Sequence, residues 1–404
     1  MSVRALLSTI GSRGEAQPVL ALAVQLRELG HDAVVCAPPD FQSWAESLGM
    51  DYVPVGPELH ETAKAAAAGV PTLEQRRRMI EGTVADQFQA IQAVAAGCGV
   101  VVGGGGLAVA AHSIAESLAV PYVYAAFAPI TLPPPHHAPP VFGMLGQTDD
   151  AGPVDIEKLW ADDRQRWNAL WKAPLNAQRE QLGLARIEDV RFHLFTARPW
   201  LAADAVLAPW PGSPDLDVLQ TGAWLLEDTR PLGPELEAFL DAGEPQIYCG
   251  FGSVRAPEGI AQMVINAARG AGRRTVIPRG WADLALIDNQ PDCISIGEVN
   301  QQALFPQVAA VAHHGGAGTT KASARAGVPQ GIIPQMFDQY YFADRVQQLG
   351  IGTALTGVQT TDNLRGALEH ALSVESTAAA HSVGARIKTE GARVAARRLV
   401  EIAD

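Results

Sequence analysis

The chain has 404 residues, of which 48% are hydrophobic and 18% are charged, and its formal net charge is −13. This length suits two domains of about 200 residues each, and the composition is typical of a globular protein with a large core. The acidic balance argues against a nucleic-acid partner, which would require a basic face, and no apolar run approaches the roughly 18 residues that a membrane helix needs.

The cysteines and the N-terminal run indicate in which cellular compartment the protein is expected. The four cysteines are far apart and form no paired-spacing motif, so we expect buried thiols in a reduced, cytoplasmic protein. The short apolar run at the N-terminus ends in a glycine-rich turn rather than a cleavage site, which favours a first strand over a signal peptide. The cysteines are Cys36, Cys98, Cys249 and Cys293.

The first elements follow a strand–loop–helix–strand plan. Residues 3–8 form an apolar run that predicts a strand, and the sequence Gly-Ser-Arg-Gly at 11–14 predicts a turn. Apolar residues then recur at helical spacing up to Gly30, and residues 33–37 predict a second strand. Such a unit begins a parallel sheet, because strands joined through a helix run in the same direction.

The same plan recurs in the next segment. It predicts a strand at 100–102, a helix at 108–118 and a strand at 122–127, so we expect a doubly wound α/β domain in the first half. Between 130 and 155 the chain is rich in proline, which lacks the amide hydrogen and fixes φ. We expect an irregular insert there, of the kind that is usually functional or mobile, and a return to helix at 160–182.

A proline-rich stretch divides the chain in two. Three prolines within six residues predict a linker at 207–217, between an N-terminal domain at 1–206 and a C-terminal domain at 218–385. We expect the chain to end in a helix from about residue 378 to 403, whose last part, 386–404, we treat as a separate segment. The predicted fold class is therefore α/β, with two Rossmann-like domains whose parallel sheets face each other across a cleft. Strands of the second sheet are expected at 246–251, 275–277, 293–296, 308–312 and 331–334.

The strongest local signal is the sequence His-His-Gly-Gly-Ala-Gly-Thr-Thr at 313–320, between a strand and a helix. Glycines let the backbone approach a ligand closely, and the start of the helix offers free amide groups to an anion. Lys321 follows the glycines in the wrong place for the nucleotide-binding P-loop. Packing alone is a weak explanation, because burying two adjacent histidines is costly. The segment therefore predicts a phosphate site.

A second polar pair lies where a strand ends. Asp338 and Gln339 follow the apolar run at 331–334 within a short loop. Ligands of open α/β sheets gather at the carboxyl ends of strands, and these side chains offer hydrogen-bond partners suited to sugar hydroxyls. An exposed loop with two polar residues is the alternative.

Residues 297–349, which contain both signals, resemble the nucleotide-sugar signature of family 1 glycosyltransferases with the two-Rossmann (GT-B) fold. Further stretches resemble the bacterial antibiotic glycosyltransferases, and among them the glycopeptide (vancomycin) group, so that the likeness spans almost the whole chain. These stretches are residues 11–18, 37–40, 199–204, 220–224 and 279–284.

The resemblance implies a role for individual residues. The N-terminal domain would bind the acceptor and the C-terminal domain the nucleotide sugar. The side chains of Asp338 and Gln339 would hold the donor sugar. The nucleobase would be bound by Arg279, Trp281 and the backbone of Val299. The donor phosphates would be bound by Ser12, Ser253, His313, Gly316, Ala317, Gly318 and Thr319.

Two positions depart from the family pattern. Related bacterial enzymes have an aspartate general base after Gly-Ser-Arg-Gly, where this chain has Glu15, a carboxylate on a stem one methylene longer. The alternative is that Glu15 only caps the helix, whose start favours negative charge. Uridine-sugar enzymes often have a glutamate at the position of Lys321, so the resemblance tilts the donor toward thymidine diphosphate sugars.

The resemblance thus implies an inverting, metal-independent hexosyltransferase that acts on a hydroxyl of an antibiotic-like natural product. The nucleotide sugar, with thymidine or uridine diphosphate, is a co-substrate. No cofactor, no nucleic-acid partner and no membrane insertion are expected.

Two alternative functions stay open. An oxidoreductase would need a Gly-x-Gly-x-x-Gly loop, whose spacing the residues at 11–14 do not have. The second alternative is a non-catalytic nucleotide-sugar binder, and the departure at Glu15 is the only feature of the sequence that points to it. The acceptor, the sugar and the oligomeric state are left open.

Overall fold

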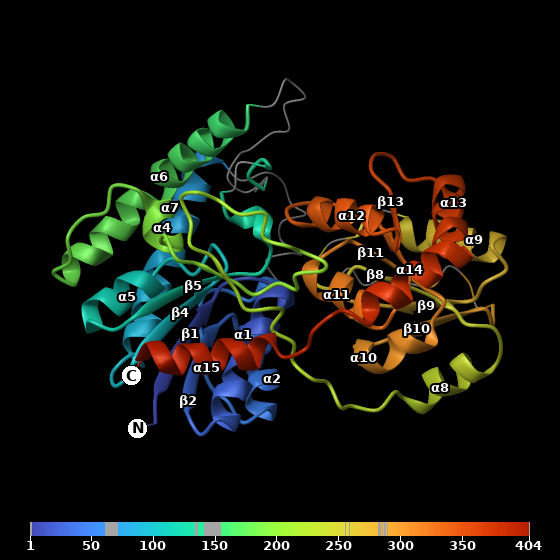
Figure 1. The fold of residues 1–404 in the computed structure, drawn as a ribbon, viewed down its shortest axis with the longest axis horizontal. Coiled ribbons are helices and arrows are strands. Elements are labelled where there is room, and N and C mark those ends of the chain that lie inside the picture. Colours follow the sequence, from blue (N-terminus) through green and yellow to red (C-terminus); the bar gives the residue numbers. More distant parts are fainter. Residues whose placement is uncertain are drawn as a thin grey trace. The chain divides into compact units, whose positions relative to one another are not determined.

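The computed structural model describes residues 2–60, 72–133, 136–140, 155–254, 256–257, 259–281, 284, 286, 288 and 290–403. The chain divides into two compact units (Figure 1). Unit 1 consists of Met1–Leu226 together with Lys388–Asp404, and unit 2 consists of Glu227–Ile387. Each unit has a parallel sheet with helices, which confirms the predicted α/β class with two Rossmann-like domains.

The sheet of unit 1 has the strand order β3-β2-β1-β4-β5-β6-β7, and its described pairs are all parallel. The chain builds outward from β1 to β3 and then returns to the other side of β1 with β4, so the order reverses between β1 and β4. The strands are β1 (Arg4–Thr9), β2 (Asp32–Ala37), β3 (Asp51–Pro54), β4 (Val100–Gly104), β5 (Tyr122–Ala126), β6 (Trp200–Leu201) and β7 (Leu219–Gln220).

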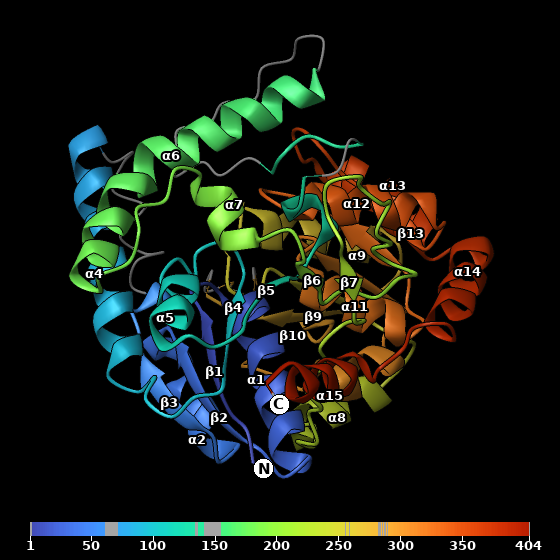
Figure 2. The ribbon, with the colours of Figure 1, turned by 60° about the vertical axis from the view of Figure 1, so that its left-hand side comes forward.

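Helices cover both faces of this sheet. Ala5 and Leu7 of β1 belong to a core cluster with α1 and α15, whereas Leu6, which points to the other face, is equally buried. Figure 2 shows α1 beside the C-terminal α15. The helices are α1 (Arg13–Glu28), α2 (Gln42–Ser47), α4 (Leu73–Gln92), α5 (Ala111–Leu118), α6 (Ile156–Gln181), α7 (Val190–Phe195) and α15 (Gly391–Ala403).

The sheet of unit 2 has the order β10-β9-β8-β11-β12-β13, again with parallel pairs, and its order reverses between β8 and β11. Its strands are β8 (Ile247–Gly250), β9 (Thr275–Pro278), β10 (Cys293–Ile296), β11 (Ala310–His313), β12 (Gln330–Ile332) and β13 (Gly352–Ala354). Its helices are α8 (Pro234–Asp241), α9 (Ile260–Gly270), α10 (Gln301–Leu304), α11 (Ala317–Arg325), α12 (Gln339–Gln348), α13 (Thr361–Ala371) and α14 (Val374–Gly384).

The predicted linker at 207–217 is part of unit 1, so the expected boundary needs correction. The side chain of Gln220 in β7 fastens this stretch, because its Oε1 accepts from the Trp210 amide at 3.1 Å and its Nε2 donates to the Ala208 carbonyl at 2.9 Å. Unit 1 extends to Leu226, and its prolines shape a packed loop rather than a free connection.

The single C-terminal helix predicted at 378–403 is also corrected. It is two helices, of which α14 belongs to unit 2 and α15 to unit 1. Between them the Lys388 amide donates to the Asp204 carboxylate at 3.2 Å. At the start of α15, a Cβ on Gly391 would lie 2.4 Å from the Ala223 carbonyl oxygen, so this close approach requires glycine.

Residues 134–135 and 141–154 of the predicted insert lie outside the described residues, and α6 begins at Ile156, earlier than expected. The four cysteines are free and buried, as predicted.

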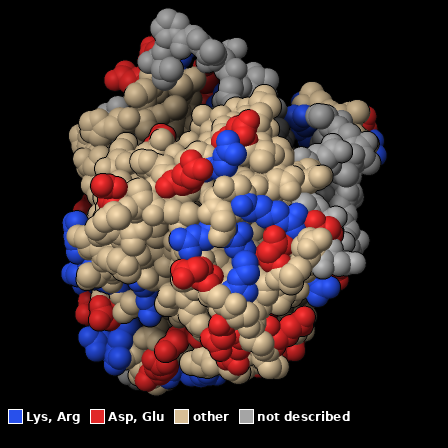
Figure 3. Space-filling model, turned by 90° about the vertical axis from the view of Figure 1, so that its right-hand side faces the viewer, with Lys and Arg blue, Asp and Glu red and all other residues tan. Residues whose placement is uncertain are grey.

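Among the described helices, none combines the length and the apolar composition that a membrane span requires. On the face shown in Figure 3, acidic and basic side chains are interspersed rather than gathered in a basic patch.

Candidate functional site

Each unit has loops of unusual sequence at the point where its strand order reverses. In unit 1 these are the loop 10–12 after β1 and the turn 105–106 after β4. In unit 2 they are the loop 251–253 after β8 and the loop 314–316 after β11. Open α/β sheets bind ligands at the carboxyl ends of the strands where the order reverses. Ser12, Ser253 and the loop that begins at His313, all predicted from the sequence, lie at or beside these two reversal points.

The carboxyl group of Glu15 is folded back over the end of β1. A Cβ on Gly11 would lie 2.7 Å from the Glu15 carboxyl carbon, and a Cβ on Gly105 would lie 3.5 Å from its Cγ. Ser12, the N-cap of α1, donates from its Oγ to Glu15 Oε2 at 3.0 Å. The two glycines thus make room for a half-buried carboxyl at the junction of β1 and β4.

The surroundings of Glu15 make its carboxylate more basic. Burial raises the pKa of Glu15 above its ordinary value, and the hydrogen bonds from the Ser12 side chain and from backbone amides offset only part of this effect. A raised pKa suits a general base, which must accept a proton near neutral pH. The capping alternative also has support, because Glu15 lies in the first turn of α1 three residues after its N-cap.

Two aromatic residues that the sequence did not point to lie beside the turn 105–106. The ring of the half-buried Phe127, just after β5, would lie 3.8 Å from a Cβ on Gly105. The edge of Trp167 would lie 3.5 Å from a Cβ on Gly106. The glycine run at 103–106 was the available signal, since it marks a close approach to the backbone at the end of a strand.

His313, predicted to contact the diphosphate, has no ring nitrogen to offer in this structure. Its side chain is fully buried, its Nδ1 accepts from the Gly315 amide at 3.0 Å, and its Nε2 lies 2.9 Å from Gln330 Oε1. Burial lowers the pKa of His313 to about 3, so the ring is neutral, with its proton on Nε2. Both nitrogens thus hold the loop in place, which argues against the predicted contact of His313 with the diphosphate.

The neighbouring His314 is the imidazole that faces the glycine loops. Its Nε2 lies 2.5 Å from where a Cβ on Gly316 would be, and its Cε1 lies 3.5 Å from where a Cβ on Gly252 would be. Burial lowers the pKa of His314 to about 4, so this ring is also neutral at pH 7. It lies between the two loops at the strand-order reversal of unit 2.

The N-terminus of α11 begins directly after this loop. Its N-cap is Gly316, which has no side chain to cap the helix. The first amides of a helix have no acceptor within the helix, which here leaves the amides of Ala317, Gly318 and Thr319 directed out of its start. Gly318 is exposed, and a Cβ there would meet nothing within 4 Å. These amides, with the positive end of the helix dipole, can bind an anion.

The loops after β8, β9 and β10 are joined to one another. The Gly252 carbonyl, next to the half-buried Ser253, accepts from the Trp281 amide at 3.1 Å. The Arg279 guanidinium lies 3.8 Å from where a Cβ on Gly297 would be, while Val299 packs partly buried against an apolar cluster. The structure thus brings the three predicted nucleobase residues onto adjoining loops, whereas Ala282 and Asp283 of the same motif lie outside the described residues.

The loop with Asp338 and Gln339 packs on the histidine loop. Gly315 has φ +92°, and a Cβ there would lie 3.0 Å from the Gln339 carbonyl oxygen. Gln339 is buried, and its Oε1 accepts from the amide of Gln335 at 2.7 Å. Phe337, a non-glycine residue with φ +56°, places the half-buried Asp338 at the N-cap of α12. Strain of this kind concentrates at functional loops.

Two groups of potential metal ligands occur within the described residues, and in both an arginine is bonded to the carboxylates. Glu116, near His112 and His193, forms an ion pair with the buried Arg179. Asp288 and Asp292, near Cys293, both bind Arg269, at 2.9 Å and 2.7 Å. Neither group adjoins the glycine loops in sequence.

Two family models match the chain. Residues 5–133 match the glycosyltransferase family 28 N-terminal domain, and residues 276–395 match the C-terminal domain of erythromycin biosynthesis protein CIII-like proteins. The first range contains Glu15, and the second contains the loops from Arg279 to Gln339.

Similar proteins cover nearly the full chain. The vancomycin aglycone glucosyltransferase of Amycolatopsis orientalis is 47% identical over 402 residues, which are 99% of this chain and 97% of that protein. A dTDP-epi-vancosaminyltransferase of the same organism is 41% identical, over 94% and 93% of the two chains. The solved glycosyltransferase VinC, in complex with dTDP, has a TM-score of 0.68 at 19% identity and covers 99% of each chain. Neither the oxidoreductase nor the non-catalytic alternative is favoured by these relatives.

Proposed function

The chain belongs to the family of GT-B glycosyltransferases that includes the vancomycin aglycone glucosyltransferase, and from this premise we propose that it transfers a hexose from a thymidine or uridine diphosphate sugar to a hydroxyl of an antibiotic-like natural product. Unit 2 binds the donor and unit 1 the acceptor. The observation that carries the proposal is the uncapped N-terminus of α11 beside His314, in a chain 47% identical to a glucosyltransferase.

In the donor site, the amides of Ala317, Gly318 and Thr319 bind the diphosphate, and Ser253 adds a hydroxyl group. His314 lies beside these amides, and its single N–H can pass from the Gly250 carbonyl to a phosphate oxygen. His313 holds the loop through its hydrogen bonds with Gly315 and Gln330. The negative charge of the leaving diphosphate grows during the reaction, so donors fixed in advance stabilise the transition state, each by about 3 kcal/mol. The carboxylate of Asp338 binds the sugar hydroxyls, and Gln339 shapes the loop that holds it.

Glu15 acts on the acceptor. Its carboxylate accepts the proton of the acceptor hydroxyl while that oxygen attacks the anomeric carbon and the bond to the diphosphate breaks. A single displacement of this kind inverts the configuration at the anomeric carbon. The helix amides and His314 supply the stabilisation of the leaving group, so the mechanism invokes neither a metal ion nor a cofactor beyond the nucleotide sugar.

The test is a transfer assay with thymidine and uridine diphosphate glucose and with vancomycin aglycone as acceptor, followed by mass spectrometry. A product heavier than the aglycone by one hexose residue is expected, and NMR of the anomeric proton would report inversion. Binding of the donor with neither transfer nor hydrolysis, across a panel of phenolic and alcoholic acceptors, would favour a non-catalytic binder. Retention of configuration would refute the single displacement.

A further inference from the structure

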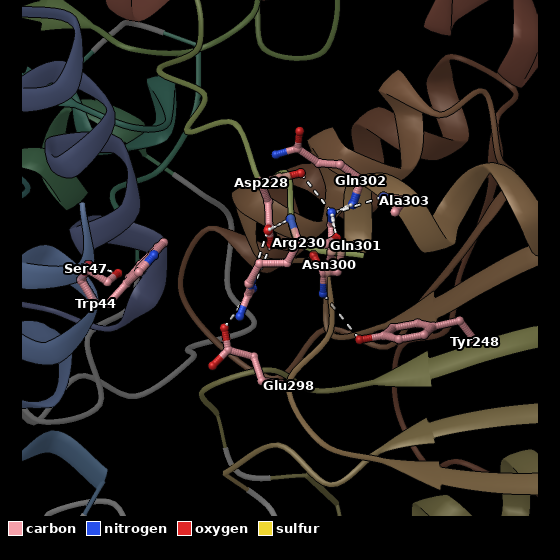
Figure 4. A network of polar contacts seen from close by, with 10 residues as sticks. All are labelled: Trp44, Ser47, Asp228, Arg230, Tyr248, Glu298, Asn300, Gln301, Gln302 and Ala303. Atoms are coloured by element: carbon pink, nitrogen blue, oxygen red, sulfur yellow. Dashed lines mark hydrogen bonds and ion pairs between the residues drawn. The ribbon is translucent and has the colours of Figure 1, made fainter. Parts of the chain in front are cut away.

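One buried asparagine joins the loop that carries Val299 to the segment through which the chain enters unit 2. Asn300 is 5% exposed, and its Nδ2 donates to the carbonyl oxygens of Asp228 at 2.8 Å and Arg230 at 2.7 Å. Its Oδ1 accepts from the amides of Gln302 at 2.9 Å and Ala303 at 3.1 Å (Figure 4). All four hydrogen-bonding positions of the amide are therefore occupied.

A surface ion pair reinforces this connection. Arg230 donates from Nε and Nη2 to the two oxygens of Asp228, at 2.9 Å and 2.7 Å, and from Nη2 to Glu298 at 3.2 Å. Glu298 and Asn300 are the two neighbours of Val299, so the residue between them is held on both sides. Because Arg230 and Glu298 are more than half exposed, their pair contributes much less than the buried asparagine.

The connected loop is the one expected to meet the nucleobase. Its first residue, Gly297, adjoins the Arg279 guanidinium, and the Arg279 amide donates to the Ile296 carbonyl at 3.0 Å. The position of the Val299 backbone is therefore set from two directions, by the loop after β9 and by the entry segment 228–230.

We propose that Asn300 is a positioning residue for nucleobase recognition: it fixes the Val299 backbone by tying its loop to Asp228 and Arg230, and it touches no ligand itself. The proposal rests on the proposed donor site. It implies that base binding and the order of the entry segment are coupled, and such a coupling is reciprocal. A bound base orders residues 227–233, and a loosened entry segment weakens base binding.

The sharpest perturbation is Asn300→Asp. Aspartate keeps the oxygen that caps α10 but replaces the donating Nδ2 by an oxygen that faces two carbonyl oxygens. The hydrogen bonds to Asp228 and Arg230 are therefore lost, and the helix cap remains. Asn363→Asp is the control, at an exposed asparagine with a similar pattern of hydrogen bonds. Asn363 also accepts from a backbone amide at a helix start, Thr360 at 2.9 Å, and donates to one carbonyl, Val358 at 3.0 Å, but at α13.

Calorimetric titration with thymidine diphosphate gives the first readout. If the ordered loop is populated about one tenth of the time in Asn300→Asp, the dissociation constant rises about tenfold. The control should stay within about twofold of the unchanged protein, since α13 carries no residue of the proposed site. Equal affinity of Asn300→Asp and the unchanged protein would overturn the positioning role alone, whereas an unchanged protein that binds no nucleotide would overturn the donor site and this inference with it.

Two further readouts separate positioning from general damage. Inorganic pyrophosphate, used to displace thymidine diphosphate, probes the phosphate loops without a base, so its inhibition constant should be the same in both proteins. An equal loss for pyrophosphate and for the nucleotide would refute a base-specific role. In hydrogen exchange, thymidine diphosphate should protect the amides of residues 227–233 in the unchanged protein and not in Asn300→Asp. Protection that persists in the variant would likewise refute the coupling.

Discussion

Replacing Glu15 by glutamine removes the proposed base and leaves its surroundings nearly intact. The amide has the volume of the carboxyl that fills the space over Gly11 and Gly105, and its oxygen can still accept from Ser12 Oγ. It cannot take up a proton, so sugar transfer should fall about 10²–10⁴-fold, which is the usual contribution of a general base. The dissociation constant for thymidine diphosphate should stay within a few-fold, because the proposed phosphate donors are unchanged.

The pH dependence gives an independent check. Transfer requires the ionised carboxylate, and burial raises the pKa of Glu15, so the rate should fall as the pH drops through a value above the ordinary carboxyl pKa of about 4.3. Glu15→Gln should lose this acid limb. The matched control is Glu28→Gln at the exposed end of the same helix, where Glu28 accepts from Gln25 at 2.8 Å. It should keep both the rate and the limb.

The sign of the stability change separates a base from a helix cap. A carboxyl whose pKa is raised by folding stabilises the protein below its unfolded-state pKa, and this contribution is lost as the pH rises through the folded-state value. At pH 7, Glu15→Gln should therefore raise Tm. A capping charge predicts the opposite, a loss of about 0.3–1 kcal/mol or about 1–4 °C in Tm. A lower Tm together with normal transfer would refute the assignment of Glu15 as the base.

The two histidines and the last helix give further expected outcomes. His314→Ala should weaken thymidine diphosphate binding by about 1.5–3 kcal/mol in calorimetry, and unchanged affinity would remove His314 from the site. His313→Ala should lower Tm, since it leaves Gln330 unpaired and a cavity behind β11, at a cost of about 2–5 kcal/mol that thermal unfolding would detect. Gly391→Ala forces a Cβ to 2.4 Å from the Ala223 carbonyl and should cost about 1–3 kcal/mol in chemical denaturation, whereas a neutral effect would mean that α15 shifts freely.

Most strands were predictable because their signals are local, whereas the short β3, β6, β7 and β13 were not predicted. Buried parallel strands are short apolar runs, and both strand-order reversals are marked by glycines that let the backbone turn sharply, as at Gly315 with φ +92°. The domain boundary was not predictable in the same way. Prolines near 210 look like a linker, and only the pairing of β7 with β6 and the bonds of Gln220, ten residues further on, place them inside unit 1.

The candidate site was predictable as a segment but not atom by atom. A sequence containing two adjacent histidines cannot tell which ring turns inward, because this depends on the register of β11 between β8 and β12. There His313 pairs with Ile332 and points to Gln330, and His314 is the first residue beyond the strand. Asn300 was missed because its carbonyl partners lie about 70 residues away in the chain, at Asp228 and Arg230.

The same architectural feature serves opposite electrostatic purposes in the two units. After β1, glycines at 11 and 105 clear space for a carboxyl, and burial there makes Glu15 a stronger base. After β11, Gly316 has no side chain to cap α11, so the amides at the start of this helix stay available for an anion. The proposed displacement takes a proton from one oxygen and leaves charge on another, so it needs one group of each kind. Glycine makes both arrangements possible, because in one loop it leaves room for the Glu15 side chain and in the other it exposes the backbone amides.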